Sequence, residues 1–259
     1  MNGSVLSIER PDAATAILTL NRPQRRNALT MELMEALCLA MESLAAEPSR
    51  RAVMLCGAGP VFCAGLDLHE AADIAIAEQS GRWVARTFQT VSDSPLLTIA
   101  AAHGAAYAGG AGLMACCDLV VAAADLRVCF PEVRRGLVPA LAAAVVRPRL
   151  RDGGLRELLL LADPIDAPRA LSLGLVDRIV PGEQLRAAAQ AVAAAALKGG
   201  PRAIRQTKRL LRELETVDRR QWMTRAAEFH NQARLGAEAH EGLAAFDEHR
   251  QPNWSSATE

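Results

Sequence analysis

Two glycine-containing turns, each following a strand of buried character, constrain the fold most. The first is GPVFCAGLD (59–67), after the apolar strand AVMLC (52–56). The second is Ala108-Gly109-Gly110, after the apolar run LLTIAAAHG (96–104). A turn between a strand and a helix leaves backbone N–H groups without intrahelical partners, so two such turns predict two convergent donors. Convergent donors stabilise the oxyanion of an enolate or a tetrahedral intermediate, which indicates carbonyl chemistry.

Apolar strands that alternate with helical segments predict an α/β fold with buried parallel pairing. The segments 5–9 and 16–21 predict a hairpin. Thr30 is the predicted cap of a helix that begins at the next residue. Further strands are predicted at 52–56, 96–102 and 118–124. A short helix that stops at Gly174 and a last strand complete this part.

From Gly182 onward the sequence predicts only helices, with Pro201 at the start of one of them. We place the domain boundary near Gly199-Gly200, which gives a core of residues 1–199 and a helical region of residues 200–259. Such a tail cannot bury all its apolar stripes alone, so we expect it to pack on the core or on another copy of the chain. Basic residues between 198 and 225 predict a solvated helix face, with an anion site or, more weakly, RNA binding as alternatives.

Composition excludes several classes of partner. The formal net charge is +0, from 29 basic and 29 acidic residues, so nothing attracts the chain generally to nucleic acid or to anionic membranes. The six cysteines lack zinc-site spacing and lie mostly in apolar runs, which predicts a reduced, intracellular protein with no metal site. The N-terminus has no signal-peptide core, and no run is long and apolar enough to span a membrane, so we expect a cytoplasmic protein.

Glu132 is the carboxylate whose surroundings are most informative. It follows CFP (129–131) after an apolar strand. One interpretation is a surface glutamate that opens a helix. The other is a carboxylate beside apolar walls made by Phe130, Val133 and Leu137, where desolvation raises its pKa and suits it to proton transfer. Gly65 is interpreted as a turn glycine and Asp67 as a helix cap, and both roles would expose N–H groups.

These residues together resemble the crotonase superfamily, that is, the enoyl-CoA hydratase/isomerase family. The resemblance runs from about residue 5 to Trp254. It is carried by the segments LNRPQRRNALT (20–30), GAGPVFCAGLDL (57–68), HGAAYAGGAGLMACCDLVVA (103–122), FPEVRRGLVP (130–139), ALSLGLVDRIVP (170–181) and EGLAAFDEHRQPNW (241–254). Each segment alone is modest evidence, but their order and spacing are specific. The resemblance implies a spiral of βα turns with two roughly perpendicular sheets and a C-terminal helical oligomerisation region, in a trimer or a dimer of trimers.

The resemblance also implies an acyl-CoA thioester as substrate, with coenzyme A entering as part of it and no separate cofactor. By position, the two oxyanion donors are the N–H groups of Leu66 and Gly109. The loop NRPQRRNAL would wrap the CoA moiety. The substrate-binding positions implied are Arg22, Arg25, Arg26, Asn27, Ala28, Ala64, Gly65, Asp67, Leu68, Gly110, Gly112 and Pro131.

The main departure from the family concerns its two hydratase glutamates. The second aligns on Glu132, whereas the first aligns on Gly112, which has no side chain. One carboxylate suits a proton shuttle between C2 and C4, as in the family's Δ3,Δ2-enoyl-CoA isomerases, and hydration would need a substitute for the missing acid. Candidates for that substitute are His103, Tyr107, Glu70, Asp73 and Glu78. We therefore predict double-bond isomerisation by Glu132, with enoyl-CoA hydration as a close alternative.

Two other functions stay open. A decarboxylase or C–C lyase acting on a carboxylated acyl-CoA would need an arginine in the acyl pocket, and Arg82, Arg86 or Arg134 could supply it. Alternatively, the chain binds thioesters without turning them over, and Gly112 marks the decay of the site. Smaller departures are Pro139–Ala143, which predicts a narrower acyl pocket than the usual glycine-rich stretch, and His249, which would hold CoA phosphates only weakly at neutral pH.

Overall fold

The computed structural model describes residues 4–150 and 152–254, and its main sheet is built from the apolar strands. In order across the sheet these are β1 (Leu6–Glu9), β2 (Thr15–Leu20), β3 (Ala52–Gly57), β4 (Leu97–Ala102), β6 (Leu119–Ala123) and β9 (Arg178–Val180). β1 and β2 pair antiparallel, which confirms the predicted hairpin. All the later pairs are parallel. The carboxyl ends of the parallel strands therefore lie along one edge, where ligands bind in open α/β sheets.

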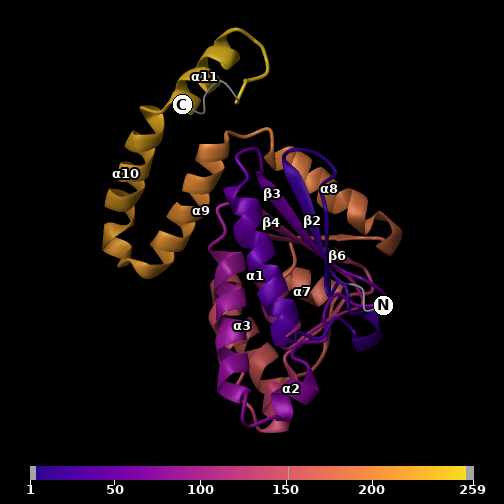
Figure 1. Cartoon of the computed structure of the whole chain (residues 1–259). Coiled ribbons are helices and arrows are strands. Elements are labelled where there is room, and N and C mark those ends of the chain that lie inside the picture. The colour runs from indigo at the N-terminus through magenta and orange to yellow at the C-terminus, as the bar shows by residue number, and fades with distance from the viewer. Residues whose placement is uncertain (1–3, 151, 255–259) are drawn as a thin grey trace. The chain divides into compact units, whose positions relative to one another are not determined.

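One face of this sheet packs against two long helices, α1 (Met31–Ala46) and α3 (Ala77–Ser92), which run beside each other (Figure 1). Thr30 caps α1, as predicted, because its hydroxyl accepts a hydrogen bond from Leu33 N at 3.3 Å. Leu18 and Leu55 of the strands share a buried core with Leu37 of α1. The periodic apolar residues of strands and helix thus bury one another.

A second, smaller sheet is present, as the family resemblance implied, although residue patterns did not predict its individual strands. It contains β5 (Ala105–Tyr107), β7 (Arg127–Cys129) and β8 (Ile165–Asp166), in that order. β5 and β7 are parallel, and Cys63 forms an isolated parallel bridge with Ala106 of β5. Strands of two or three residues are too short to show a periodic pattern of apolar residues, so residue patterns do not reveal them.

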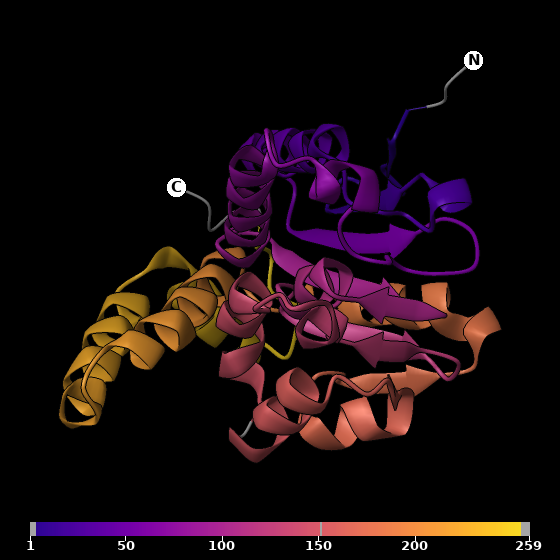
Figure 2. The ribbon, with the colours of Figure 1, turned by 90° about the horizontal axis from the view of Figure 1, so that it is seen from below.

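Shorter helices connect the strands. They are α2 (Leu68–Ala72), α4 (Gly109–Ala115), α5 (Ala140–Val146), α6 (Asp152–Arg156), a π-helical turn (Glu157–Leu161) and α7 (Ala167–Leu173), with 3-10 turns at Pro23–Arg25, Pro131–Arg135, Arg147–Arg149 and Gly182–Gln184. Gly174 ends α7 with φ 87°, which confirms the predicted glycine stop. Figure 2 shows these connections from below. The helices between residues 140 and 161 were not predicted.

The chain forms two compact units, Met1–Ala193 and Ala194–Glu259, and α8 (Leu185–Ala196) crosses their boundary. The described part of the second unit contains α9 (Pro201–Thr216), a 3-10 turn (Arg219–Gln221), α10 (Trp222–Arg234) and α11 (Ala237–Asp247), which confirms the purely helical prediction. The Glu238 carboxylate accepts hydrogen bonds from Arg202 N at 2.7 Å and Ala203 N at 2.9 Å. This carboxylate therefore satisfies the first turn of α9.

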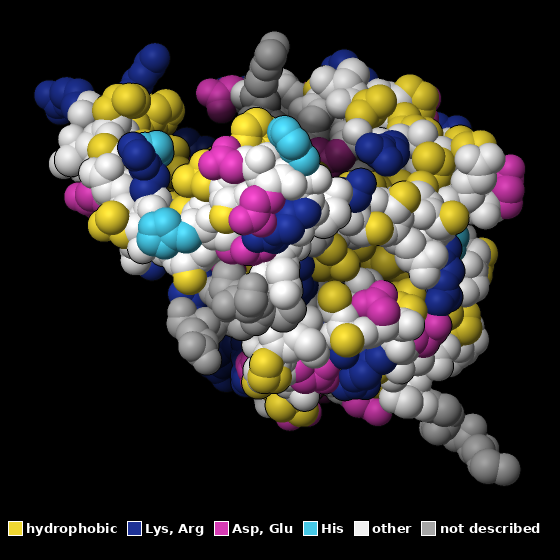
Figure 3. Space-filling model, turned by 90° about the horizontal axis from the view of Figure 1, so that it is seen from above, with side chains coloured by type: hydrophobic (Ala, Val, Ile, Leu, Met, Phe, Trp, Pro, Cys, Tyr) yellow, Lys and Arg dark blue, Asp and Glu magenta, His cyan; other side chains and the backbone are white. Residues whose placement is uncertain are grey.

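Charges within the second unit are matched locally. Arg209 and Arg225 both pair with Glu213, and each guanidinium lies 5.2 Å from the ring centre of Phe229. Among the described residues on the face seen from above, basic side chains are interspersed with acidic ones (Figure 3). No helix within 4–150 or 152–254 is both long and apolar enough to cross a membrane.

Candidate active site

Three chain segments end side by side at the second sheet. Cys63 pairs in parallel with Ala106, and Ala106 pairs in parallel with Val128. Just beyond this row, Ala108 N donates a hydrogen bond to Cys129 O at 2.8 Å. The residues that follow in each segment therefore meet at one edge. The sequence predicted functional groups in all three, and the structure brings these segments together.

The backbone of Leu66 is held so that its N–H group is free. Leu29 N donates to Gly65 O at 2.8 Å, and Asp67 N donates to Leu29 O at 3.0 Å. In such a parallel ladder the residue between the two bonded positions turns its N–H away from the neighbouring strand. Among the described residues, no acceptor is bonded to Leu66 N. An oxyanion donor needs an N–H group that is free in this way.

The N–H group of Gly109 lies next to that of Leu66. Gly109 begins α4, where first-turn N–H groups have no intrahelical acceptor. A methyl group on Gly109 would lie 3.8 Å from Leu66 N, and one on Gly65 would lie 3.3 Å from Gly109 N. Ala108 adopts φ 48° and ψ −123°, a costly conformation for a residue with a side chain. The strained residue therefore directly precedes the free N–H group of Gly109.

Gly65 is a glycine for two physical reasons. Its φ is 96°, in the left-handed region that side chains disfavour. A methyl group there would also lie 2.8 Å from Tyr107 O, too close for any real contact. At Gly110, a methyl group would lie 2.3 Å from Cys63 O, so this glycine lets α4 pack against the first segment. Both predicted positions serve the close approach of the two donor turns.

Glu132 lies in the 3-10 turn Pro131–Arg135 and is half-buried. Its Oε2 atom is buried and has no hydrogen-bond partner among the described residues. Burial raises the pKa of this carboxyl above 4.5, although its own backbone N–H and Arg135 oppose the shift. Of the three predicted apolar walls, Phe130 is fully buried, whereas Val133 and Leu137 are exposed. The carboxylate is therefore desolvated from the core side.

The buried carboxylate should reduce stability at neutral pH. Because its pKa is raised in the folded state, the folded protein binds the proton more tightly, and stability falls as pH rises from about 4.5 through the raised value. Glu132→Gln removes this charge. We expect the variant to gain thermal stability relative to wild type at pH 8 and to gain less at pH 4.5, as measured by paired melting curves. An equal difference at both pH values would contradict the buried-charge account.

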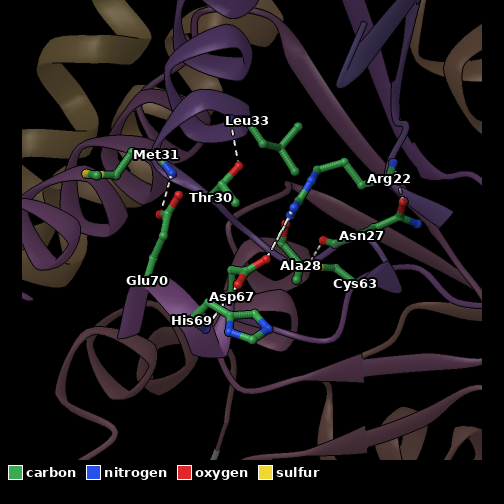
Figure 4. A network of polar contacts seen from close by, with 10 residues as sticks. All are labelled: Arg22, Asn27, Ala28, Thr30, Met31, Leu33, Cys63, Asp67, His69 and Glu70. Carbon is green, nitrogen blue, oxygen red and sulfur yellow. Dashed lines mark hydrogen bonds and ion pairs between the residues drawn. The ribbon is translucent and has the colours of Figure 1, made fainter. Parts of the chain in front are cut away.

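The loop before α1 is fixed by an ion pair (Figure 4). Both terminal nitrogens of Arg22 lie 3.2 Å from Asp67 Oδ2, and Arg22 Nη1 also donates to Ala28 O at 2.5 Å. Asp67 in turn caps α2 by accepting from His69 N at 3.1 Å. Burial alone would raise the pKa of Asp67, but the His69 N–H and the Arg22 guanidinium together lower it. Arg22 is thus engaged within the chain, beside the Leu66 donor.

The structure separates the predicted CoA-loop residues into two groups. Asn27 is fully buried, and its Nδ2 donates to Ala58 O at 2.8 Å and Val61 O at 2.9 Å. Together with Arg22 it is scaffolding that ties the loop to the first donor turn. Arg25 and Arg26 are exposed and form the outward cationic part of the loop. Sequence patterns gave no signal of this division, because it depends on which acceptors the fold brings near each side chain.

Most candidate substitutes for the missing acid are engaged elsewhere. Glu70 accepts from Met31 N at 2.9 Å, Asp73 accepts from Ala75 N at 2.9 Å, Glu78 pairs with Arg82, and His103 Nε2 bonds to Gly59 O at 2.8 Å. His103 also lines a cavity of about 440 Å³ with Cys56, Asp125 and Arg186. Tyr107 is half-buried. Within the described residues, no cluster of three or more His, Cys, Asp or Glu could hold a metal ion.

The arginines proposed for a carboxylated substrate are surface residues. Arg82 pairs with Glu78, Arg86 pairs with Glu42 at 3.1 Å, and Arg134 pairs with Asp163. Each of these side chains is more than half exposed. An arginine that selects a carboxylated acyl chain would instead face the acyl site. The geometry gives the decarboxylase and lyase alternatives no support.

The other predicted positions lie around the donor turns. Ala64 N donates to Arg26 O at 3.0 Å, which joins the two loops. Leu68 is largely exposed at the start of α2, and Pro131 begins the turn that holds Glu132. Gly112 is buried in α4, where Phe88 of α3 is its neighbour.

Comparison with known proteins identifies the family. The sequence profile of the family described as enoyl-CoA hydratase/isomerase matches residues 10–257. The chain is 32% identical over 248 residues to an enoyl-CoA hydratase of Mycobacterium tuberculosis, covering 93% of each chain. It is 28% identical over 269 residues to an enoyl-CoA isomerase/hydratase of Mycosarcoma maydis, covering 97% of this chain and 98% of that protein.

Solved structures give the same result. The crystal structure of an enoyl-CoA hydratase from Mycobacterium smegmatis superposes with a TM-score of 0.91 at 30% identity, covering 97% of this chain and 99% of that one. The chain therefore has the crotonase fold, as the sequence predicted. This fold consists of two sheets flanked by helices and a C-terminal set of helices. The chain belongs to the enoyl-CoA hydratase/isomerase family of the crotonase superfamily, a family of acyl-CoA enzymes.

Proposed function

We propose that this chain isomerises 3-enoyl-CoA thioesters to 2-enoyl-CoA thioesters, with Glu132 as the proton shuttle. The observation that carries the proposal is the state of the carboxylates. Glu132 has a buried oxygen without a partner and a raised pKa, whereas Gly112, which aligns with the other hydratase glutamate, has no side chain. A single desolvated carboxylate that can both take and return a proton suits isomerisation.

The reaction needs two proton transfers. The thioester oxygen accepts hydrogen bonds from Leu66 N–H and Gly109 N–H, which makes a C2 proton more acidic by stabilising the enolate. The Glu132 carboxylate takes that proton, and the electron pair from the broken C–H bond enters a dienolate. The Glu132 carboxylic acid then returns the proton to C4, the C2=C3 double bond forms, and the carboxylate is regenerated. The net change is the transfer of one proton from C2 to C4 and a shift of the double bond. No other reactant is needed, and coenzyme A takes part only as a portion of the substrate.

Hydration of 2-enoyl-CoA is the second candidate, because most of the related proteins carry hydratase names. Hydration would require a second polar group to hold the attacking water or to deliver a proton. Four of the five possible substitutes are engaged in other contacts. We therefore favour isomerisation.

Binding of the CoA phosphates should depend more on Arg25 and Arg26 than on Arg22. We expect Arg25→Ala/Arg26→Ala to raise KM for a short acyl-CoA by about 10-fold, with kcat little changed and a weaker dependence of KM on salt, because exposed cations interact through screened charges. The measurement is initial-rate kinetics at two salt concentrations. Arg22→Ala is the matched control, and it should lower the melting temperature. An unchanged KM in the double variant would contradict the assignment.

We also propose a homo-oligomer. Met223, Leu235 and Phe246 of the second unit are each at least three-quarters exposed, and in this proposal they pack against another copy of the chain. Light scattering of the purified protein would give its mass in solution. A monomer at micromolar concentration would contradict the proposal.

The decisive experiment compares wild type and Glu132→Gln on 2-enoyl-CoA and 3-enoyl-CoA in parallel. Formation of the conjugated 2-enoyl chromophore from the 3-enoyl substrate reports isomerisation, and its loss from the 2-enoyl substrate reports hydration. We expect wild type to isomerise and the variant to be nearly inactive. Hydration at an ordinary enzymatic rate, with no isomerisation, would overturn the proposal in favour of the second candidate.

A further inference from the structure

The ring of Phe88 fills the space that a side chain at Gly112 would need. A methyl group on Gly112 would lie 2.5 Å from Phe88 Cζ and 2.8 Å from Cε2. Both distances are shorter than real carbon contacts allow. Phe88 is only 3% exposed, so its ring is enclosed by neighbouring atoms and has little freedom to withdraw. Position 112 therefore lacks a glutamate, and the space that its side chain would need is filled by an aromatic ring.

This ring lies against α4, the helix whose first residue carries the second proposed oxyanion donor. Gly112 is one helical turn beyond Gly109 on α4, and residues three apart share one face of a helix. Phe88 belongs to α3, which packs against α4. A carboxylate at position 112 would thus emerge beside the turn that carries the second donor, and Phe88 places an apolar ring edge there instead.

We propose that Phe88 determines reaction specificity by excluding water from the side of the acyl site where a second carboxylate would stand. This inference rests on the proposed function and names the residue that would hold the site to isomerisation. An ordered water needs two to four polar partners, and an aromatic edge with a glycine beside it offers none. With no water held there, a proton taken by Glu132 from C2 is returned to C4, and the double bond is not hydrated.

The ring and the glycine should act as a pair, which a double-mutant cycle can reveal. The proteins are wild type, Phe88→Ala, Gly112→Glu and Phe88→Ala/Gly112→Glu, with Phe88→Leu as the control that keeps an apolar filler. Each is assayed for hydration of 2-enoyl-CoA and for isomerisation of 3-enoyl-CoA. The ratio of the two rates is the main readout, because a purely structural defect would lower both together. Melting temperature and CoA-ester binding are recorded for every variant.

The expected pattern is strongly non-additive. Gly112→Glu alone should melt about 5–10 °C below wild type, because its side chain is forced against the ring. Phe88→Ala alone should keep a low hydration ratio, because an apolar cavity stays dry. The double variant should melt above Gly112→Glu and raise the ratio of hydration to isomerisation at least 10-fold. Phe88→Leu should keep the wild-type ratio.

Two results would overturn the role of Phe88. One is a Gly112→Glu variant with wild-type stability and as much hydration as the double variant, since the ring would then not be in the way. The other is a double variant that folds, binds CoA esters and isomerises, yet gains no hydration. In that case isomerisation by the same protein upholds the proposed function, so only the inference fails. Absence of isomerisation in wild type refutes the proposed function instead, and the coupling of melting temperatures between positions 88 and 112 then decides the packing claim.

Discussion

Glu132→Gln should lower kcat for isomerisation of 3-enoyl-CoA by about 10²–10⁴-fold, which is the usual contribution of a general acid–base group. The amide has nearly the same size and neither accepts nor returns a proton. KM should change little, because the half-buried side chain is assigned to the chemical step and not to CoA binding. Stopped-flow or steady-state formation of the conjugated product measures the effect.

A matched control is available on the surface of the same unit. Glu183 is also a glutamate in a 3-10 turn, Gly182–Gln184, but it is exposed. Glu183→Gln should leave both kcat and KM at wild-type values. If Glu132→Gln turned over 3-enoyl-CoA as fast as this control, the proton-shuttle assignment would be wrong.

Gly109→Pro should lower kcat by about 10²–10³-fold, because proline has no N–H and removes one of the two donors to the developing enolate oxygen. Proline is otherwise well suited to the first position of a helix, which is where Gly109 begins α4. The loss should therefore appear in turnover of a protein that still folds and still binds CoA esters. Circular dichroism and ligand binding check those two conditions.

Gly109→Ala is the control that keeps the N–H group. Its methyl group would lie 3.4 Å from Leu29 Cδ1, the flexible end of a side chain, and 3.8 Å from Leu66 N. We expect kcat to stay within about 10-fold of wild type, because the donor is retained. Equal losses in the alanine and proline variants would show that crowding, and not the missing donor, causes the effect, and this would remove Gly109 N–H from the mechanism.

The longer elements could be predicted because their signals are local. β2, β3 and β4 each contain six residues of mostly apolar type, and α1 combines a capping Thr30 with apolar residues at helical spacing. The short strands β5, β7 and β8 could not, because two or three residues do not establish a period. They exist because β7 pairs with two segments that lie far from it in the sequence, β5 on one side and β8 on the other.

The features of the candidate site also differ in whether the sequence reveals them. Three features of the site are visible in the sequence: the turn glycine Gly65, the glycine pair that begins with Gly109, and a carboxylate after an apolar strand at Glu132. The engagement of Arg22 with Asp67 is not, since the two lie 45 residues apart and a surface arginine in the same loop has identical chemistry. Tertiary contacts alone distinguish the arginine that positions the loop from those that face solvent.

The sequence by itself determined the fold class, and it predicted the two donor turns and a glycine where the family's hydratases have a glutamate, because each depends on residue type and spacing along the chain. Only the tertiary structure decided what stands in place of that glutamate. Phe88 and Gly112 are 24 residues apart, and neither residue alone predicts the other. Close packing of α3 on α4 brings the ring onto the glycine, and the volume available in a packed core, not sequence pattern, determines which side chains can coexist there.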